Sequence, residues 1–160
     1  MSISAEISSA VGLEKKVFPV IPLRYLHTPP FRFDFSKHNP EIQGVDMSDA
    51  NTLQTFIDET LSKNGKTWGM GGYNEDRFFY EKSELFKSGS EYRSIHLGLD
   101  IWLPAGTELY APLESKVHSF QNNAHFLDYG PTIILEHNIS GVIFWTLYGH
   151  LSMESLSELH

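Results

Sequence analysis

The sequence predicts a mainly β fold with one helix. Short segments in the second half of the chain alternate between apolar and polar residues or are apolar throughout, as strands are. Only one segment repeats its apolar residues with the period of a helix. Turn-forming residues at 138–141 separate two apolar segments and indicate a hairpin. We therefore expect strands at 95–101, 108–111, 116–120, 132–137 and 142–148, the last two joined as a hairpin.

The one helix is expected at 48–64. Ser48 or Asp49 can cap its first turn with a side-chain oxygen, and Gly65 is a suitable C-terminal stop. The apolar stripe that would face a core is formed by Leu53, Phe56, Ile57 and Leu61. We interpret this helix as structural rather than catalytic.

Before the helix, segment 17–40 is rich in proline and aromatic residues. It holds five of the eight prolines in the chain, and proline removes a backbone donor and disfavours a continuous helix. We therefore predict an extended N-terminal wrap that packs on the surface of the domain. Its aromatic residues are Phe18, Tyr25, Phe31, Phe33 and Phe35.

Composition excludes several classes of protein. The formal net charge of -8 argues against binding to nucleic acid, which needs a basic surface. Because the chain has no cysteine, any metal site must be built from His, Asp and Glu. The first 20 residues lack the pattern of a signal peptide, and no apolar run is long enough to span a membrane. We therefore expect no membrane partner, and a cytoplasmic location unless a leader was removed.

A glycine-rich loop is expected at 67–86, where Gly69, Gly71 and Gly72 lie close together. Two interpretations stay open. In the first, Arg77 holds an anionic group of a substrate and Asn74 offers an oxygen to a bound ion. In the second, the loop is a tight connector and Arg77 forms an ion pair within the protein.

His96 and Asp100 are candidate ligands of a divalent cation such as zinc, which accepts imidazole nitrogen and carboxylate oxygen. In a straight strand, residues four apart lie roughly 13 Å from each other, too far for one ion. Gly98 lies between them, and we expect it to let the backbone kink so that the two side chains converge.

At this point the sequence resembles the lysostaphin-like zinc endopeptidases, also called the LytM-type peptidases. The resemblance covers about 95–152. It rests on His96-Leu-Gly-Leu-Asp100, followed by the segments Pro-Ala-Gly-Thr at 104–107, Tyr-Ala-Pro at 110–112 and Leu-Tyr-Gly-His-Leu-Ser at 147–152. It implies an antiparallel, barrel-sandwich-like sheet core at 91–160, preceded by an extension at 1–90.

The resemblance also implies the roles of individual residues. His96 and Asp100 would bind zinc, and His150 would act beside the metal-bound water as a catalytic group, while Tyr148 would contact substrate. The family supplies a third ligand from a later histidine-any-histidine element, which this chain lacks. We therefore expect the third ligand and further strands downstream of the chain end, and weak or substoichiometric zinc in these 160 residues.

The other histidines are expected to be ordinary sheet or loop residues. His118 lies in a predicted strand and His125 in a polar loop, while His137, next to the hairpin turn, is the strongest of the three as an extra ligand. The terminal His160 is the only histidine after the 147–152 motif.

Three functions are compatible with these motifs. The favoured one is a zinc endopeptidase domain that cleaves peptidoglycan-type or similar peptides and is inactive in this truncated form. The second is a degenerate, non-catalytic relative that binds a peptide, glycan or partner protein. The third is a phosphocarrier-like domain in which His96 is phosphorylated. A sheet that ends near 148 would leave an unpaired edge, which predicts a homodimer formed through that edge.

Overall fold

The computed structural model describes residues 2–14, 16–46, 49–77, 80, 86–88, 91–125, 128–157 and 159. The chain forms two compact units. Unit 1 consists of Met1–Leu23 and Glu108–His160, and unit 2 consists of Arg24–Thr107. This division differs from the segments 1–90 and 91–160 expected from the sequence, because the two ends of the chain pack together in unit 1.

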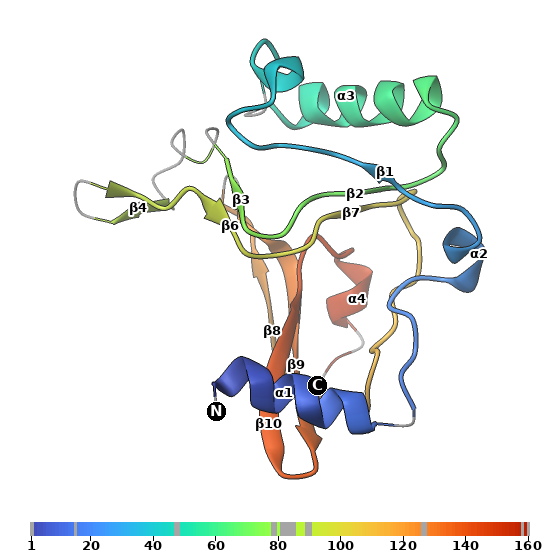
Figure 1. The fold of residues 1–160 in the computed structure, drawn as a ribbon, viewed down its shortest axis with the longest axis vertical. Coiled ribbons are helices and arrows are strands. Elements are labelled where there is room, and N and C mark those ends of the chain that lie inside the picture. Colours follow the sequence, from blue (N-terminus) through green and yellow to red (C-terminus); the bar gives the residue numbers. More distant parts are fainter. Residues whose placement is uncertain are drawn as a thin grey trace. The chain divides into compact units, whose positions relative to one another are not determined.

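The predicted fold class is confirmed, because the protein is mainly β (Figure 1). The described strands form two sheets of three strands and two sheets of two strands. All but one of the described strand pairs are antiparallel. Within the described part of the chain, the sheets do not close into a barrel.

The sheet of unit 1 has long, regular strands. It is antiparallel, in the order β10-β9-β8. The bounds are Lys116–Asn123 for β8, Gly130–Ile139 for β9 and Val142–Tyr148 for β10. The strands predicted at 116–120, 132–137 and 142–148 are therefore confirmed, and the first two are longer than predicted.

The hairpin between β9 and β10 has a two-residue loop, because Ile139 pairs with Val142. Ser140 and Gly141 both have positive φ, at 53° and 86°, as a type I′ turn requires. The predicted hairpin at 138–141 is confirmed.

Helix α1, Ile3–Leu13, was not expected from the sequence. The Ser2 side chain caps it by accepting a hydrogen bond from the backbone N–H of Ala5. Ala10 is buried on one face of the helix and packs with Leu113, Ile139 and Phe144 to form the core of unit 1. Ile7 and Val11 pack against the same core, and with Ile3 and Ala10 they recur at the spacing of a helix, a sequence signal that the prediction did not use. Near the other end of the chain, after β10, unit 1 also contains the one-turn helix α4 at Glu154–Ser157.

The predicted strand at 108–111 is wrong. This segment makes single backbone contacts with the N-terminal part of unit 1: Tyr110 N–H donates to Val20 and Phe18 N–H donates to Pro112, both at 2.8 Å. Pro19, Pro22 and Pro112 have no N–H to donate, so these contacts do not extend into a ladder.

Unit 2 contains short strands of two residues each. Sheet β1-β2-β7 is formed by Phe31–Arg32, Gly69–Met70 and Ile101–Trp102, and β1 and β2 are parallel. The two-stranded sheets pair β3, Glu75–Asp76, with β6, Ile95–His96, and β4, Lys87–Ser88, with β5, Glu91–Tyr92. The unit also holds the 3-10 turn η1 at Pro40–Ile42, and the one-turn helix α2 lies at Leu23–Leu26.

The predicted helix is α3, Ala50–Lys63. Asp49 caps it by accepting hydrogen bonds from the N–H and the hydroxyl of Thr52, while Ser48 lies outside the described residues. Gly65 follows with φ 61°, the left-handed conformation that suits a helix stop. The structural interpretation of this helix is supported, because its buried Ile57 belongs to the core of unit 2.

The core of unit 2 consists of Phe33, Phe35, Ile42 and Ile57. The prediction that segment 17–40 packs on the surface is therefore wrong for Phe33 and Phe35, which are 5% and 2% exposed. Trp102 packs against both rings, at centroid distances of 4.9 and 5.2 Å. The extended path predicted for this segment is interrupted by the single turn of α2.

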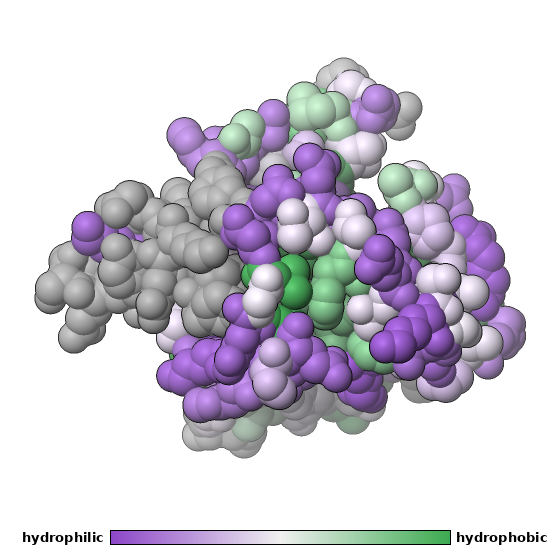
Figure 2. Space-filling model, turned by 90° about the horizontal axis from the view of Figure 1, so that it is seen from above, coloured by the Kyte–Doolittle hydropathy of each residue, from purple (hydrophilic) through white to green (hydrophobic). Residues whose placement is uncertain are grey.

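Hydrophilic residues predominate on the face drawn in Figure 2, around a small hydrophobic patch. Among the described residues, none of the helices has the length and apolar character needed to cross a membrane.

Candidate metal centre

The segment expected as a strand at 95–101 is divided into β6 and β7 by residues 97–100. The break brings His96 and Asp100 together, with Nε2 of the imidazole 3.4 Å from Oδ1 of the carboxylate. The missing side chain of Gly98 makes room for the His96 ring, since a Cβ at this position would lie 3.0 Å from His96 Nε2. The expected convergence of the two side chains is thus found, and Gly98 leaves room for the imidazole ring.

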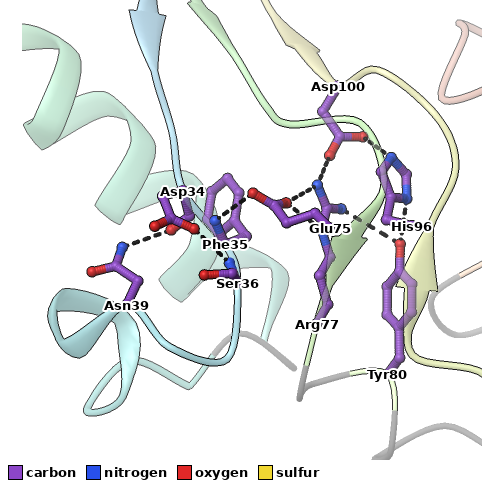
Figure 3. A network of polar contacts seen from close by, with 9 residues as sticks. All are labelled: Asp34, Phe35, Ser36, Asn39, Glu75, Arg77, Tyr80, His96 and Asp100. Carbon is purple, nitrogen blue, oxygen red and sulfur yellow. Dashed lines mark hydrogen bonds and ion pairs between the residues drawn. The ribbon is translucent and has the colours of Figure 1, made fainter.

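The imidazole of His96 is fixed by a neighbouring tyrosine (Figure 3). Tyr80 OH lies 2.6 Å from His96 Nδ1. His96 Nε2 is buried and has no hydrogen-bond partner within the described part of the chain, because its contact with Asp100 is long. A buried nitrogen without a partner, facing a carboxylate oxygen, is an arrangement in which a cation would be stabilised.

Arg77 links Asp100 to a second carboxylate. Its Nη2 lies 2.5 Å from Asp100 Oδ2 and 2.7 Å from Glu75 Oε2, and its Nε donates to Glu75 Oε2 at 2.8 Å. The other oxygen of Glu75 accepts the backbone N–H of Phe35 at 2.9 Å. The guanidinium is buried between these carboxylates and close to the Phe35 ring. Arg77 therefore forms ion pairs within the protein.

The charges in this cluster shift the pKa of both partners. Burial alone would raise the pKa of the Asp100 carboxyl, but the His96 imidazole and the Arg77 charge outweigh burial and lower it. Burial alone would lower the pKa of the Arg77 guanidinium, but the charge of Asp100 and the hydrogen bonds to Asp100 and Glu75 raise it. Asp100 is therefore ionised near neutral pH, as a metal ligand must be.

The glycines of the 67–86 loop make close contacts inside unit 2. A Cβ at Gly69 would lie 2.3 Å from the Phe33 ring, and one at Gly71 would lie 3.0 Å from the Trp102 ring and 3.2 Å from Asp100 Cβ. The glycines thus let the backbone pack against aromatic side chains. This favours the interpretation of the loop as a tight connector, although Phe78 and Phe79 of the loop lie outside the described residues.

Asn74 is exposed in the turn before β3 and has a left-handed backbone with φ 59°. Asparagine tolerates this conformation better than most residues. The structure therefore gives Asn74 a turn-forming role, and its predicted contact with a substrate or an ion stays a prediction.

His150 and Tyr148 belong to unit 1, whereas His96, Asp100 and Arg77 belong to unit 2. His150 follows β10 with φ 57°, and its N–H donates to the Tyr129 carbonyl at 2.6 Å. Its side chain is exposed. A non-glycine residue in this conformation costs about 1–3 kcal/mol and is often found at functional sites. Tyr148 OH accepts a hydrogen bond from Thr146 at 3.3 Å.

His137 is fully buried, and both ring nitrogens have partners. Nδ1 lies 3.0 Å from the Glu114 carbonyl oxygen, and Nε2 lies 2.8 Å from the Thr146 hydroxyl. The ring stacks on Phe144 at 4.8 Å. These contacts support the expected structural role of a sheet histidine. His118 and His125 are exposed in unit 1, and His160 lies outside the described residues.

Within the described ranges, no three His, Cys, Asp or Glu side chains are grouped as a metal site. His96 and Asp100 thus form a pair that could supply two ligands. Sequence reasoning missed Tyr80 and Glu75 as members of the cluster. In the sequence, Tyr80 lies in an aromatic run and Glu75 in a polar segment, and neither has a spacing that relates it to His96.

Comparison of the chain with protein-family models, with curated proteins and with solved structures gives no match. The resemblance to lysostaphin-type peptidases therefore rests on the sequence motifs alone.

Proposed function

We propose that this chain is a zinc-dependent endopeptidase domain of the lysostaphin type, acting on peptidoglycan-type or similar peptides. The observation that carries the proposal is the pair formed by His96 Nε2 and Asp100 Oδ1, which lie 3.4 Å apart. The nitrogen is buried without a hydrogen-bond partner among the described residues, and the carboxylate is held ionised. One neutral imidazole and one carboxylate are donors that zinc accepts.

The donor set fits zinc in chemistry but is incomplete in number. Zinc sites in enzymes usually have three protein ligands. The described residues supply two side by side, and in the resembling family a third comes from a histidine-any-histidine element that is not in this sequence. We therefore expect weak binding, with zinc lost on dialysis, from the 160-residue chain.

Bound zinc would supply Lewis acidity, which polarises a peptide carbonyl and lowers the pKa of water. His96 and Asp100 would hold the ion, and Arg77 would keep the Asp100 carboxylate in place. His150 has an exposed imidazole at the end of β10 and is the proposed catalytic group by the resemblance, in which a histidine at this position moves a proton to or from the attacking water or stabilises the developing oxyanion. Tyr148 would orient the substrate.

Zinc titration of the chain and of single variants tests this proposal. His96→Ala and Asp100→Ala should each abolish zinc binding, whereas His150→Ala should leave it unchanged. In a longer form that includes the third ligand, His150→Ala should keep zinc and lose turnover. His125→Ala, a loop histidine, is the matched control. Tight 1:1 binding that survives His96→Ala would contradict the proposed ligands.

A non-catalytic binding module is the second candidate. It is favoured by the ion pairs of Asp100 and Glu75 with Arg77, which stabilise unit 2 without a metal. If a longer form with the third ligand binds zinc yet cleaves no peptide, this candidate replaces the first. The burial of His96 Nε2 argues against the phosphocarrier alternative, because a phosphodonor must reach a ring nitrogen. Phosphohistidine formation would revive it.

A further inference from the structure

We infer that Tyr80 and Arg77 are positioning residues that prepare His96 and Asp100 to bind a divalent cation, an inference that rests on the proposed function. Tyr80 holds the His96 ring by Nδ1 and can accept a hydrogen bond from that nitrogen when Nδ1 carries the proton. Arg77 holds one oxygen of Asp100 and leaves the other facing His96.

The contacts form one continuous chain in unit 2 (Figure 3). Arg77 Nη2 contacts Asp100 Oδ2, and Arg77 Nη1 donates to Tyr80 OH at 3.4 Å. Tyr80 OH in turn contacts His96 Nδ1. The two atoms left over, His96 Nε2 and Asp100 Oδ1, face each other. Each ligand is thus held at one atom by a positioning residue, while its second atom points at the position a cation would take.

The contact between Tyr80 and His96 is compatible with either neutral form of the imidazole. When Nε2 carries the proton, the N–H points toward Asp100 Oδ1 and Nδ1 accepts the Tyr80 O–H. When Nδ1 carries the proton, it donates to the Tyr80 oxygen, and the lone pair of Nε2 faces a carboxylate oxygen. That arrangement is repulsive unless a cation lies between the two atoms.

Cation binding therefore selects the second form. On cation binding the single imidazole proton would move from Nε2 to Nδ1, and Tyr80 would keep its own proton and turn it away from Nδ1. The number of bound protons would be unchanged. Metal-binding histidines commonly donate their other N–H to an oxygen in this way, and loss of that partner costs roughly 10–100-fold in affinity.

The guanidinium of Arg77 restricts the geometry of Asp100. The Arg77 side chain is 5% exposed, and its Cζ lies 5.5 Å from the centroid of the Phe35 ring and 5.9 Å from that of the Tyr80 ring. Its planar fork contacts two carboxylates at once, which a lysine ammonium cannot reproduce. With Oδ2 held by Arg77, Asp100 offers one oxygen to a cation.

Coulomb attraction and positioning predict opposite effects for loss of the Arg77 charge. Arg77 offsets one of the two carboxylate charges, so its removal makes the cluster more negative and would strengthen cation binding by charge alone. If Arg77 positions Asp100, its removal weakens binding. Arg77→Lys separates the effects, because it keeps the charge and loses the fork.

The experiment is a zinc titration of the full chain followed by nitrogen-15 NMR of the histidine rings, which detects weak binding and distinguishes the two ring forms. His96→Ala assigns the His96 signals. In the wild type we expect the proton on Nε2 without zinc and on Nδ1 with zinc. Tyr80→Phe removes only the hydroxyl and should weaken zinc binding at least about tenfold. Arg77→Lys should also weaken it.

The matched control is Tyr73→Phe, since Tyr73 lies in the same unit and is 66% exposed. It should leave the zinc affinity and the His96 spectrum unchanged. If Tyr80→Phe binds zinc as the wild type does while His96→Ala does not bind it, the inference is overturned and the proposed function stands.

A wild type whose His96 signals do not respond to zinc overturns the proposed function instead. The zinc-free spectra then still test the role of Tyr80. Tyr80→Phe must shift the Nδ1 signal, and if it does not, the inference is overturned as well. Circular dichroism of each variant shows whether the fold is retained.

Discussion

Units 1 and 2 are stabilised in different ways. Unit 1 is built on strands of 8, 10 and 7 residues with a nearly continuous antiparallel register. Unit 2 is built on strands of two residues, an aromatic core and a buried ionic cluster. Backbone hydrogen bonds therefore define most of unit 1, whereas side-chain packing defines unit 2.

The difference bears on where a site can form. Long regular strands separate residues that lie four apart, because each residue advances the chain by about 3.3 Å. The short strands β6 and β7 let the chain turn between His96 and Asp100, so that the two side chains meet. The irregular unit, rather than the regular sheet, provides the candidate metal pair.

The largest expected effect is in the aromatic core of unit 2. Phe35→Ala should lower the free energy of unfolding of unit 2 by about 3–5 kcal/mol, because it leaves a cavity beside Phe33 and Trp102. Labelling with 5-fluorotryptophan and fluorine NMR report on each unit, since Trp68 and Trp102 belong to unit 2 and Trp145 to unit 1. Phe18→Ala, at a position 58% exposed, is the control. Equal losses in the two variants would contradict packing as the source of stability.

A smaller effect is expected from the buried histidine of unit 1. His137→Ala should destabilise unit 1 by roughly 1–3 kcal/mol, because the Glu114 carbonyl and the Thr146 hydroxyl lose their partner. Urea unfolding, monitored by the Trp145 fluorine signal, measures the loss. His125→Ala, in an exposed loop, should have little effect. If His137→Ala left unit 1 unchanged, the backbone ladder alone would account for its stability.

The third prediction concerns the edge of the long sheet. Among the described strands, β10 pairs only with β9, and Ile143, Trp145 and Leu147 are 51%, 54% and 47% exposed. These three residues alternate along β10 and therefore lie on one face of the strand, with Trp145 in the middle. A second copy of β10 could add to this edge as an antiparallel strand, with the two Trp145 residues opposite each other, and the two apolar faces would then be continuous. We therefore expect a dimer whose association constant depends less on salt concentration than that of a dimer held by ion pairs.

Sedimentation equilibrium tests this prediction. Trp145→Lys should weaken association at least tenfold, or about 1.4 kcal/mol, because it places a charge in the paired edge. Val117→Lys, on strand β8 at the opposite edge, should not. A wild-type chain that stays monomeric at every concentration would show that this edge does not mediate self-association.

The smallest expected effect is at the cap of α3. Hydrogen bonds from the Thr52 hydroxyl and N–H lower the pKa of the Asp49 carboxyl from its usual value. The pKa of Asp49 is lower in the folded protein than in the unfolded chain. The ionised carboxylate therefore stabilises the folded protein at pH values above the unfolded-state pKa, and this stabilisation is lost as the pH falls through the folded-state pKa. Asp49→Asn keeps a capping oxygen but does not titrate, so it should match the wild type near neutral pH.

Urea midpoints of unit 2, measured between about pH 5 and pH 3, test this prediction. The wild type should lose slightly more stability than Asp49→Asn over this range, because only the wild type protonates its cap. Glu59→Gln, on the same helix, is the control for loss of a surface charge. Parallel pH curves for the wild type and Asp49→Asn would show that the cap does not depend on the charge of Asp49.

The sequence by itself determined the elements whose pattern is local. The period of α3 with its cap at Asp49, the hairpin around Ser140 and Gly141, and the alternation in β8, β9 and β10 all depend on neighbours in the chain. The convergence of His96 and Asp100 was also predictable, because the two residues lie only four apart in the sequence and Gly98 lies midway between them.

Only the tertiary structure decided which residues surround that pair. Glu75 reaches the cluster because β3 pairs with β6, and Tyr80 reaches it by its side-chain contacts with Arg77 and His96. No period in the sequence encodes such contacts. Phe33 and Phe35 are core residues because α3 and Trp102 cover them, although their proline-rich segment resembles a surface wrap. Burial depends on what packs against a side chain, and residues far apart in the chain supply that packing.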